Sequence, residues 1–370
     1  MNAARQSALL GMDLEELASI AEEFAQPPYR ASQLFEAIYR RRVQSTMEIS
    51  SLPLDFRNSL GAKELSVGLP SIEKKFVSAD GTVRYLMAFA DGQSVETVWM
   101  PEGDGGEAGD GSEAGVQMER PGERAWSRAT ICVSSQVGCA VDCQFCLTAL
   151  LGVKRNLTAG EIVGQVCAVL NDQGVSPPQE RVNLVFMGMG EPLLNYDNFM
   201  KAVRLLVEGC GIPESRMTVS TAGIVPRIYD LGLEAVRPKL AISLNAPNDE
   251  LRTRLMPLNR KWNLEKLMAA ARDFPLRNRE KLTFEYVLLG GVNDNDKEAR
   301  QLAELVRGVR AKVNLIALNP GPGIEFQTPD GERTLRFQNI LSAANVPAFI
   351  RRPRGRDIYA ACGQLKRTTE

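Results

Sequence analysis

Four of the seven cysteines of this 370-residue chain lie within fifteen residues, from Cys132 to Cys146. Cys139, Cys143 and Cys146 form a CxxxCxxC run, and thiolates are soft ligands that select zinc or iron–sulfur centres. A structural zinc site would need a fourth Cys or His ligand nearby. No fourth ligand completes a usual spacing here, and the chain contains no histidine. Three thiolates on a short loop are suited to a four-iron cluster with one iron left open for a substrate or cofactor.

The composition limits the class of protein and its compartment. The length allows one large domain with small attachments, and the formal charge of -1 gives no overall signal for nucleic-acid binding. We therefore expect any RNA contact to come from local basic patches. The N-terminal stretch has no apolar signal core, and no apolar run is long enough to span a membrane. Cysteines crowded in one loop do not indicate a secreted disulfide framework, so we expect a cytoplasmic protein without a membrane partner.

From residue 129 onward, short apolar runs rich in β-branched residues alternate with helical patterns, and the predicted helices include 159–170, 196–208, 264–274 and 296–309. Such alternation predicts parallel strands joined by right-handed helical crossovers. The six predicted strands are 129–133, 182–187, 217–220, 240–244, 283–288 and 313–318. The predicted fold class is α/β, with a partial (β/α)6 barrel whose site lies at the carboxyl ends of the strands.

The cysteine motif resembles that of a known superfamily. The pattern CxxxCxFC, with Phe145 before the last cysteine, is similar to that of the radical S-adenosylmethionine (SAM) enzymes. The longer string from Cys132 to Thr158 resembles the RlmN family, which methylates adenine C2 in 23S ribosomal RNA and in transfer RNA. The resemblance implies a [4Fe-4S] cluster on Cys139, Cys143 and Cys146, and SAM bound at the open iron.

A second group of residues follows the predicted strands. The turn Gly188–Pro192 lets backbone approach a ligand closely, and Glu191 can accept a hydrogen bond from an ammonium group. The resemblance implies that SAM is bound by Gly190, Glu191, Ser220, Ser243, Leu244, Asn245 and Asn319. Some relatives have histidine where this chain has Asn245, and an amide there can still form hydrogen bonds. Each of these residues also has a simpler interpretation as a polar cap at the end of a strand.

The resemblance also assigns catalytic roles to three residues outside the cluster motif. Cys362 lies in Ala360–Leu365, which resembles the C-terminal segment whose cysteine carries the methyl group. In the implied mechanism one SAM methylates Cys362, a second SAM yields the radical that activates the methyl group, and Cys132 then attacks Cys362 to release the RNA. Glu96 is the implied acceptor of the C2 proton, although a cysteine could serve instead. The simpler interpretation of Glu96 is a solvent-facing strand residue.

Two basic segments are candidate phosphate contacts. One is the triplet Arg40–Arg42, which could equally be a solvated helix end, and the other is the basic segment that begins at Arg351.

The chain is expected to have five regions. The regions are an N-terminal helical RNA-contacting domain (1–65), an antiparallel β extension (66–100), a flexible acidic glycine-rich insertion (101–127), the radical SAM barrel (128–350) and a C-terminal basic segment with the carrier cysteine (351–370).

The function implied by the resemblance is methylation of adenine-2503 in 23S rRNA and adenine-37 in tRNAs. It requires a flavodoxin-like electron donor and a thiol reductant, and we expect a monomer. Two alternatives remain open at this point. A Cfr-type relative would methylate the same rRNA adenine at C8, and a metal-stabilised RNA-binding module would have no catalysis at all.

Overall fold

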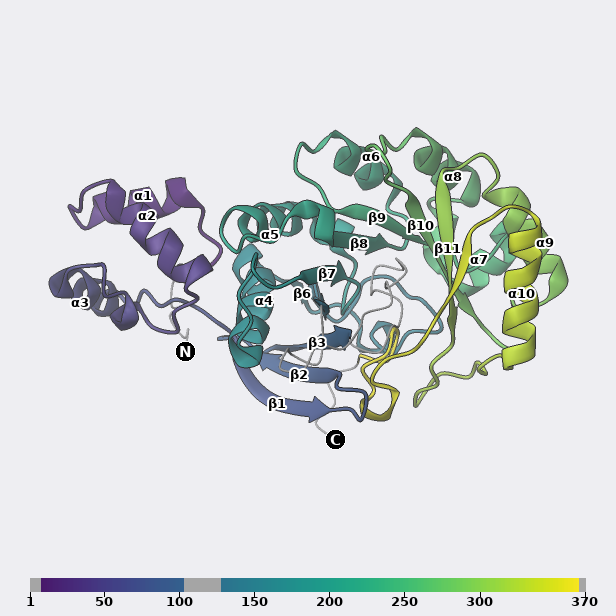
Figure 1. The fold of residues 1–370 in the computed structure, drawn as a ribbon, viewed down its shortest axis with the longest axis horizontal. Coiled ribbons are helices and arrows are strands. Elements are labelled where there is room, and N and C mark those ends of the chain that lie inside the picture. Colours follow the sequence, from purple (N-terminus) through teal and green to yellow (C-terminus); the bar gives the residue numbers. More distant parts are fainter. Residues whose placement is uncertain (1–7, 103–127, 366–370) are drawn as a thin grey trace.

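The computed structural model describes residues 8–102 and 128–365, and one continuous sheet runs through them (Figure 1). Its strand order is β1-β2-β3-β4-β7-β8-β9-β10-β11-β12. The strands are β1 (Ser71–Val77), β2 (Val83–Ala88), β3 (Ser94–Glu102), β4 (Arg128–Cys132), β7 (Val182–Phe186), β8 (Met217–Thr221), β9 (Lys239–Ser243), β10 (Leu282–Leu288), β11 (Ala311–Ala317) and β12 (Ala348–Arg351). A separate small ribbon joins β5 (Gln136–Val137) to β6 (Arg155–Asn156).

The sheet changes character at β4. Strands β1 to β4 pair antiparallel, whereas every later neighbour, from β4–β7 to β11–β12, pairs parallel. The six predicted barrel strands are all present, which confirms the α/β fold class and the partial barrel. The residues predicted as a β extension continue the barrel sheet, because Val98 on β3 is paired with Cys132 on β4. Of the predicted insertion 101–127, residues 103–127 lie outside the described residues.

Helices cover the outside of the parallel strands (Figure 1). They are α4 (Ala159–Gln173), α5 (Tyr196–Glu208), α6 (Val225–Leu233), α7 (Asp249–Leu255), α8 (Leu264–Asp273), α9 (Asp296–Leu305) and α10 (Gly331–Ala343). The start of α4 shows how local chemistry fixes such an element. Thr158 accepts a hydrogen bond from the Glu161 backbone N–H at 3.1 Å, and the Glu161 carboxylate accepts one from the Thr158 N–H at 2.9 Å. This capping box satisfies two amide groups that the first helical turn leaves unpaired.

The N-terminal segment is a small helical unit beside the barrel, with α1 (Leu14–Glu23), α2 (Tyr29–Phe35) and α3 (Leu54–Ala62) (Figure 1). Arg42 connects this unit to α4 and the turn that follows it. Its guanidinium donates to the Asn171 side chain and to the Val175 carbonyl, both at 2.9 Å. Arg42 is therefore buried and structural, whereas Arg40 and Arg41 are exposed. Of the predicted triplet, Arg40 and Arg41 are the arginines left at the surface.

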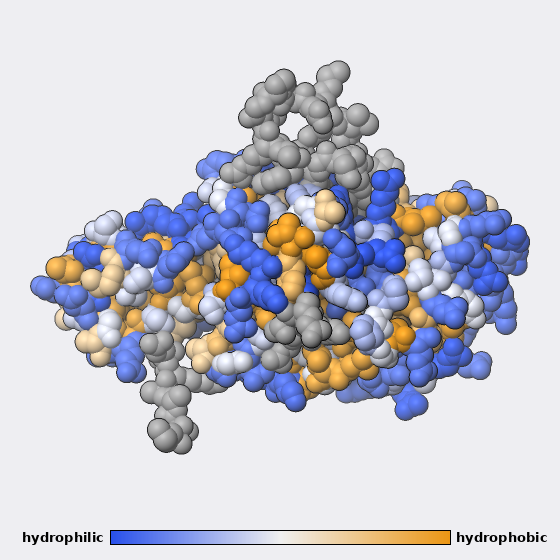
Figure 2. All heavy atoms as spheres, turned by 90° about the horizontal axis from the view of Figure 1, so that it is seen from below, coloured by the Kyte–Doolittle hydropathy of each residue, from blue (hydrophilic) through white to orange (hydrophobic). Residues whose placement is uncertain are grey.

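Figure 2 shows one face of the molecule, on which hydrophobic side chains gather toward the middle and hydrophilic side chains occupy most of the periphery. Among the helices in residues 8–102 and 128–365, none has the length and apolar character needed to cross a membrane.

Candidate active site

Two adjoining cavities open at the carboxyl ends of the parallel strands. The first has an empty volume of about 990 Å³, and the second has an empty volume of about 1530 Å³. They share part of their walls, namely Cys146, Thr148, Met187, Gly188, Glu285, Ile316, Asn319, Cys362 and Gly363. A group on this shared wall can meet ligands in both cavities.

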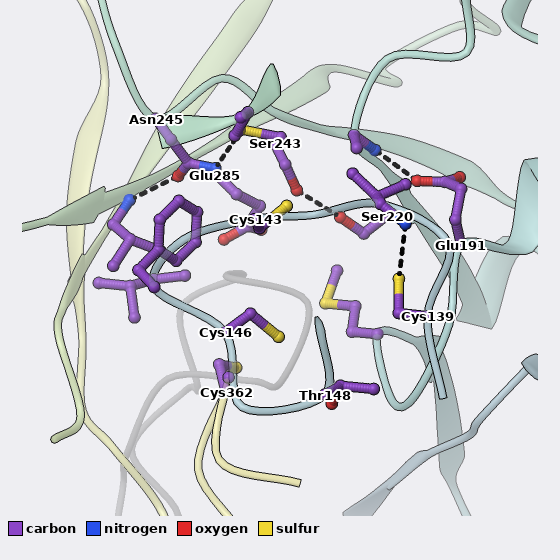
Figure 3. A pocket seen from close by; sticks show the side chains of 18 of the residues that line it. Cys139, Cys143, Cys146, Thr148, Glu191, Ser220, Ser243, Asn245, Glu285 and Cys362 are labelled. Atoms are coloured by element: carbon purple, nitrogen blue, oxygen red, sulfur yellow. Dashed lines mark hydrogen bonds between the residues drawn. The ribbon is translucent and has the colours of Figure 1, made fainter. Parts of the chain in front are cut away.

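The loop with Cys139, Cys143 and Cys146 forms one side of the first cavity (Figure 3). Gly138, at the start of this loop, has a φ of 80°, and a Cβ there would lie 1.8 Å from the Gly152 carbonyl oxygen. Only glycine permits so close an approach of the two backbones. The β5–β6 ribbon then holds the ends of the loop together, so that all three thiols line the cavity.

The three thiols fit a four-iron cluster better than a single ion. Within the described residues, no group of three Cys, Asp or Glu side chains could hold one metal ion together. A four-iron cluster needs no such convergence, since each cysteine binds a different iron at its corner. Burial raises the pKa of Cys139 to about 12, and it raises the pKa of Cys143 well above its usual value. Bound iron would offset this burial effect, because a coordinating thiol is deprotonated.

Glu191 lines the first cavity and is nearly inaccessible to solvent. Its carboxylate accepts hydrogen bonds from the backbone N–H groups of Ala222 at 2.6 Å and Leu193 at 3.1 Å. Burial raises the pKa of Glu191 to about 7, although these hydrogen bonds lower it. The preceding Gly190 has a φ of 101°, and a Cβ there would lie within 2.6 Å of Gln136. Glycine at 190 therefore allows the turn to place the carboxylate in the cavity wall.

The other predicted SAM contacts occupy different positions around this cavity. Ser220 and Ser243 line it with their hydroxyl oxygens 3.2 Å apart, and Asn319 lines both cavities. Leu244 is buried and is not among the residues that line either cavity.

Asn245 lines the first cavity, but its side chain is engaged within the protein. Its amide oxygen accepts the Val287 N–H at 2.8 Å, and its amide nitrogen lies 3.2 Å from the Met256 sulfur. Its φ of 58° belongs to the left-handed region, which asparagine tolerates better than most residues. The amide thus fixes the strand end.

Cys132 and Cys362 both line the second cavity, although 229 residues lie between them in the sequence. Cys132 is the last residue of β4, and Cys362 lies in the C-terminal segment, which folds back over the strand ends. Cys362 lines the first cavity as well. Cys362 is exposed to solvent, whereas Cys132 is half-buried. Burial raises the pKa of Cys132, and a negative charge on Cys362 would raise it further, as expected for neighbouring sulfurs. All seven cysteines are free thiols in this structure.

Glu96 is fully buried, so its interpretation as a solvent-facing strand residue is wrong. Its carboxylate forms an ion pair with Arg84, whose side chain is also fully buried. Its backbone carbonyl accepts a hydrogen bond from the Ser134 hydroxyl at 2.6 Å. Glu96 is not among the described residues that line either cavity.

Glu285, on β10, is a site residue that the sequence analysis missed. It is buried, lines both cavities, and accepts a hydrogen bond from the Asn314 side chain at 3.0 Å. Burial raises its pKa, while the charges of Arg351 and Lys312 lower it. The available signal was a lone carboxylate inside the apolar strand pattern of 283–288. The second cavity also receives Arg351, Arg352 and Arg354 from the basic C-terminal segment.

Comparison with known proteins places this site in a class. A family model described as the Radical SAM superfamily matches residues 133–303. The crystal structure of a radical SAM methyltransferase from Sphaerobacter thermophilus is similar to this structure with a TM-score of 0.86. The two chains are 41% identical, and the match covers 98% of this chain and all of the other. The barrel and its cysteine loop therefore define a radical SAM enzyme, whose cofactors are a [4Fe-4S] cluster and SAM.

The sequence comparison is more specific. A probable dual-specificity RNA methyltransferase RlmN from Koribacter versatilis is 64% identical over 94% of this chain and 98% of its own length. A dual-specificity RNA methyltransferase RlmN from Syntrophobacter fumaroxidans is 45% identical over 95% of this chain and 96% of its own. The chain belongs to the RlmN family. The predicted family and its radical SAM class are confirmed.

Proposed function

We propose that this enzyme methylates C2 of adenine in RNA, at adenine-2503 of 23S rRNA and adenine-37 of tRNAs, with Cys362 as the methyl carrier. The observation that carries the proposal is the position of Cys362 on the wall shared by the two cavities. The first cavity has the residues suited to the cofactors. The second has Cys132 and three arginines, which suit a thiol exchange and the phosphates of an RNA strand.

In the first cavity the protein holds the cofactors. Cys139, Cys143 and Cys146 would ligate the cluster, and the Glu191 carboxylate would accept a hydrogen bond from the ammonium group of SAM. Ser220, Ser243 and Asn319 would supply further polar contacts to SAM. The Asn245 amide is engaged within the protein and Leu244 does not line the cavity, so neither side chain is included among these contacts. When bound, the cluster supplies the electron that cleaves SAM and so generates the radical that activates the methyl group.

Adenine C2 is electron-poor and lies between two ring nitrogens, so it cannot displace the methyl group of SAM directly. Cys362 overcomes this by accepting the methyl group on sulfur, where it forms a thioether. After activation, the same carbon forms a bond to C2 and links the RNA to the protein. Loss of the C2 proton and of one electron, which would return to the cluster, restores the aromatic ring. Cys132 then attacks the Cys362 sulfur, the sulfur–carbon bond breaks, and the released carbon takes up a proton to become the new methyl group. A thiol reductant must afterwards reduce the resulting disulfide.

The C2 proton also needs an acceptor, and Glu96 is the proposed base. A carboxylate is the form that accepts a proton, and Glu96 has a buried cationic partner in Arg84. A cysteine in the second cavity is the alternative acceptor. The target adenine must leave its stack to enter this cavity, as for other enzymes that modify a base.

The remaining parts of the proposal concern partners. A flavodoxin-like protein would deliver the electron, and exposed Arg40 and Arg41 would contact RNA phosphates at the N-terminal helical unit. We place the reaction in the cytoplasm, where a thiol reductant is at hand, and expect the enzyme to act as a monomer.

Nucleoside analysis of RNA tests the proposed function. RNA from cells that lack the enzyme would be incubated with reconstituted protein, SAM and a reductant, then digested and analysed by mass spectrometry against synthetic standards. The proposal predicts 2-methyladenosine in both rRNA and tRNA. Finding 8-methyladenosine would replace it with the C8 chemistry, and RNA binding without any methylated product would support the non-catalytic module.

A further inference from the structure

The segment that carries Cys362 is bonded directly to the end of the cysteine loop. The Leu147 N–H, one residue after Cys146, donates a hydrogen bond to the Gly363 carbonyl at 2.8 Å. The Thr148 hydroxyl donates to the Leu365 carbonyl at 2.6 Å, across 217 residues of sequence. Both carbonyl groups belong to the three residues that follow Cys362. The carrier segment and the cysteine loop are therefore one hydrogen-bonded assembly.

A second anchor holds the same segment from another side. The Gln364 side chain donates to the Pro320 carbonyl at 2.8 Å, and its oxygen accepts the Ala361 N–H at 3.3 Å. Gln364 and Leu365 are both buried, although Gln364 is polar. The segment is thus packed between the cysteine loop and the loop that follows β11.

Thr148, Cys362 and Gly363 line both cavities. Figure 3 shows Cys362 beside Cys146, with Thr148 on the same side of the pocket. In this docked position the Cys362 sulfur borders the cofactor cavity and the second cavity together. A carrier that stayed docked would receive and deliver its methyl group without travelling between two sites.

We infer that Thr148 is a positioning residue, which keeps the Cys362 segment docked on the cysteine loop so that one sulfur serves both cavities. The inference rests on the proposed role of Cys362 as methyl carrier. The role inferred for Thr148 is exerted through the Leu365 carbonyl, to which its hydroxyl donates. The anchoring loop is also the one that would hold the cluster, so iron content has to be measured to separate loss of docking from loss of the cluster.

The substitution Thr148→Val tests this role. Valine has nearly the same shape but leaves the buried Leu365 carbonyl without its donor, so undocking should become about tenfold more frequent. Thr148→Ser keeps the hydroxyl and is the conservative rescue. Thr334→Val is the matched control, because its hydroxyl makes an equivalent bond to the Asp330 carbonyl at 2.9 Å on α10, away from both cavities.

The primary measurement is hydrogen–deuterium exchange of the anaerobic holoenzyme, read by mass spectrometry over peptides that contain Leu147 and Gln364. We expect Thr148→Val to exchange about tenfold faster at these amides, while Thr148→Ser and Thr334→Val match the wild type there. RNA methylation should fall in Thr148→Val alone, in line with the docked fraction that the exchange rates imply, with iron content and affinity for SAM unchanged.

Two results would overturn the inference. One is unchanged exchange of the carrier segment in Thr148→Val, and the other is wild-type methylation of Cys362 and RNA in a Thr148→Val enzyme whose exchange shows the segment to be mostly undocked. If Thr148→Val does not fold, Gln364→Leu is the second variant, because it removes the hydrogen bond from the Gln364 side chain to the Pro320 carbonyl. It must then show the same faster exchange of the carrier segment with unchanged iron content. A wild-type enzyme that never carries a methyl group on Cys362, but still shows the exchange effect, would overturn the proposed carrier function and not the docking.

Discussion

Two buried carboxylates near the strand ends have opposite surroundings. Glu96 is paired with Arg84 and is not among the described residues that line the cavities. Glu285 lines both cavities and accepts one hydrogen bond, from Asn314. The family resemblance assigns the proton acceptor to Glu96, whereas the cavity walls place Glu285 closer to Cys362. A negative charge on Glu285 raises the pKa of Cys362, which is consistent with this proximity.

The variants Glu96→Gln and Glu285→Gln separate these two positions. If Glu96 is the base, Glu96→Gln should form methylated Cys362 and the RNA–protein adduct normally but release product at least about a hundredfold more slowly. Glu285→Gln should lower RNA methylation about tenfold or more, because its carboxylate faces both ligand spaces. Quenched single-turnover reactions, analysed for Cys362 methylation and for adduct, would assign the steps. If the adduct accumulated in Glu285→Gln while Glu96→Gln released its product normally, Glu285 would be the base and Glu96 would not.

Removal of Cys132 should stop the reaction at its last step. In Cys132→Ala the sulfur that attacks Cys362 is absent, so the RNA should stay linked to the protein through Cys362. Denaturing gels should show a slow-migrating species that nuclease shortens, and Cys210→Ala, at a position that lines neither of the two cavities, should show none. Free methylated RNA from Cys132→Ala at the wild-type rate would contradict the role proposed for this thiol.

The residue identities of the site were largely predictable, and their environments were not. The cysteine spacing, the glycine–glutamate turn and the carrier motif are local patterns, so they can be recognised in the chain. Burial of Glu96 and engagement of Asn245 depend on neighbours that only the folded sheet brings together. Glu285 was missed for the same reason, since nothing local separates a carboxylate in a cavity from one at a strand edge.

At the scale of elements, backbone geometry sets the cysteine loop. The substitution Gly138→Ala would place a Cβ against the Gly152 carbonyl at a φ of 80°. We expect a loss of about 1–3 kcal/mol in folding stability, and fewer bound irons per chain after reconstitution. Gly331→Ala is the control, because Gly331 begins α10 and a Cβ there meets no atom within 4 Å. Equal iron content and equal melting temperatures in the two variants would refute this account of the loop.

The elements that the sequence analysis did not predict are those with weak local signals. Helix α7 is short and mostly charged, and α10 buries only Thr334, Phe337 and Leu341 on its inner face. Helix α6 begins beside Pro226 and contains Gly232, both of which weaken a helical pattern. Strand β12 has four residues and pairs parallel with β11, an interaction that only the closed sheet provides. The strands and helices that were predicted have apolar patterns of their own, whereas capping does not separate the two groups, since α7 and α10 both begin with a side-chain cap.

At the scale of the whole molecule, neighbouring arginines have different roles. Arg42→Ala should destabilise the contact between the N-terminal unit and α4 by about 2–3 kcal/mol, since it leaves the buried Val175 carbonyl unpaired. Arg41→Ala should leave folding stability unchanged and weaken RNA binding, with the slope of affinity against salt reduced by about one. Chemical denaturation and salt titrations of RNA binding would measure the two effects. The account would fail here if Arg41→Ala bound RNA with the wild-type salt dependence.

The central claim is that one sulfur links the two cavities, and intact-protein and peptide mass spectrometry of Cys362 tests it most directly. Anaerobically purified enzyme would be analysed with iron and sulfide counted in the same sample. The account predicts a methyl group, or a methylene-linked nucleotide, on Cys362 beside about four irons per chain. Unmodified Cys362 in a zinc-containing protein would contradict the enzymatic account, and unmodified Cys362 beside an intact cluster would contradict the carrier role.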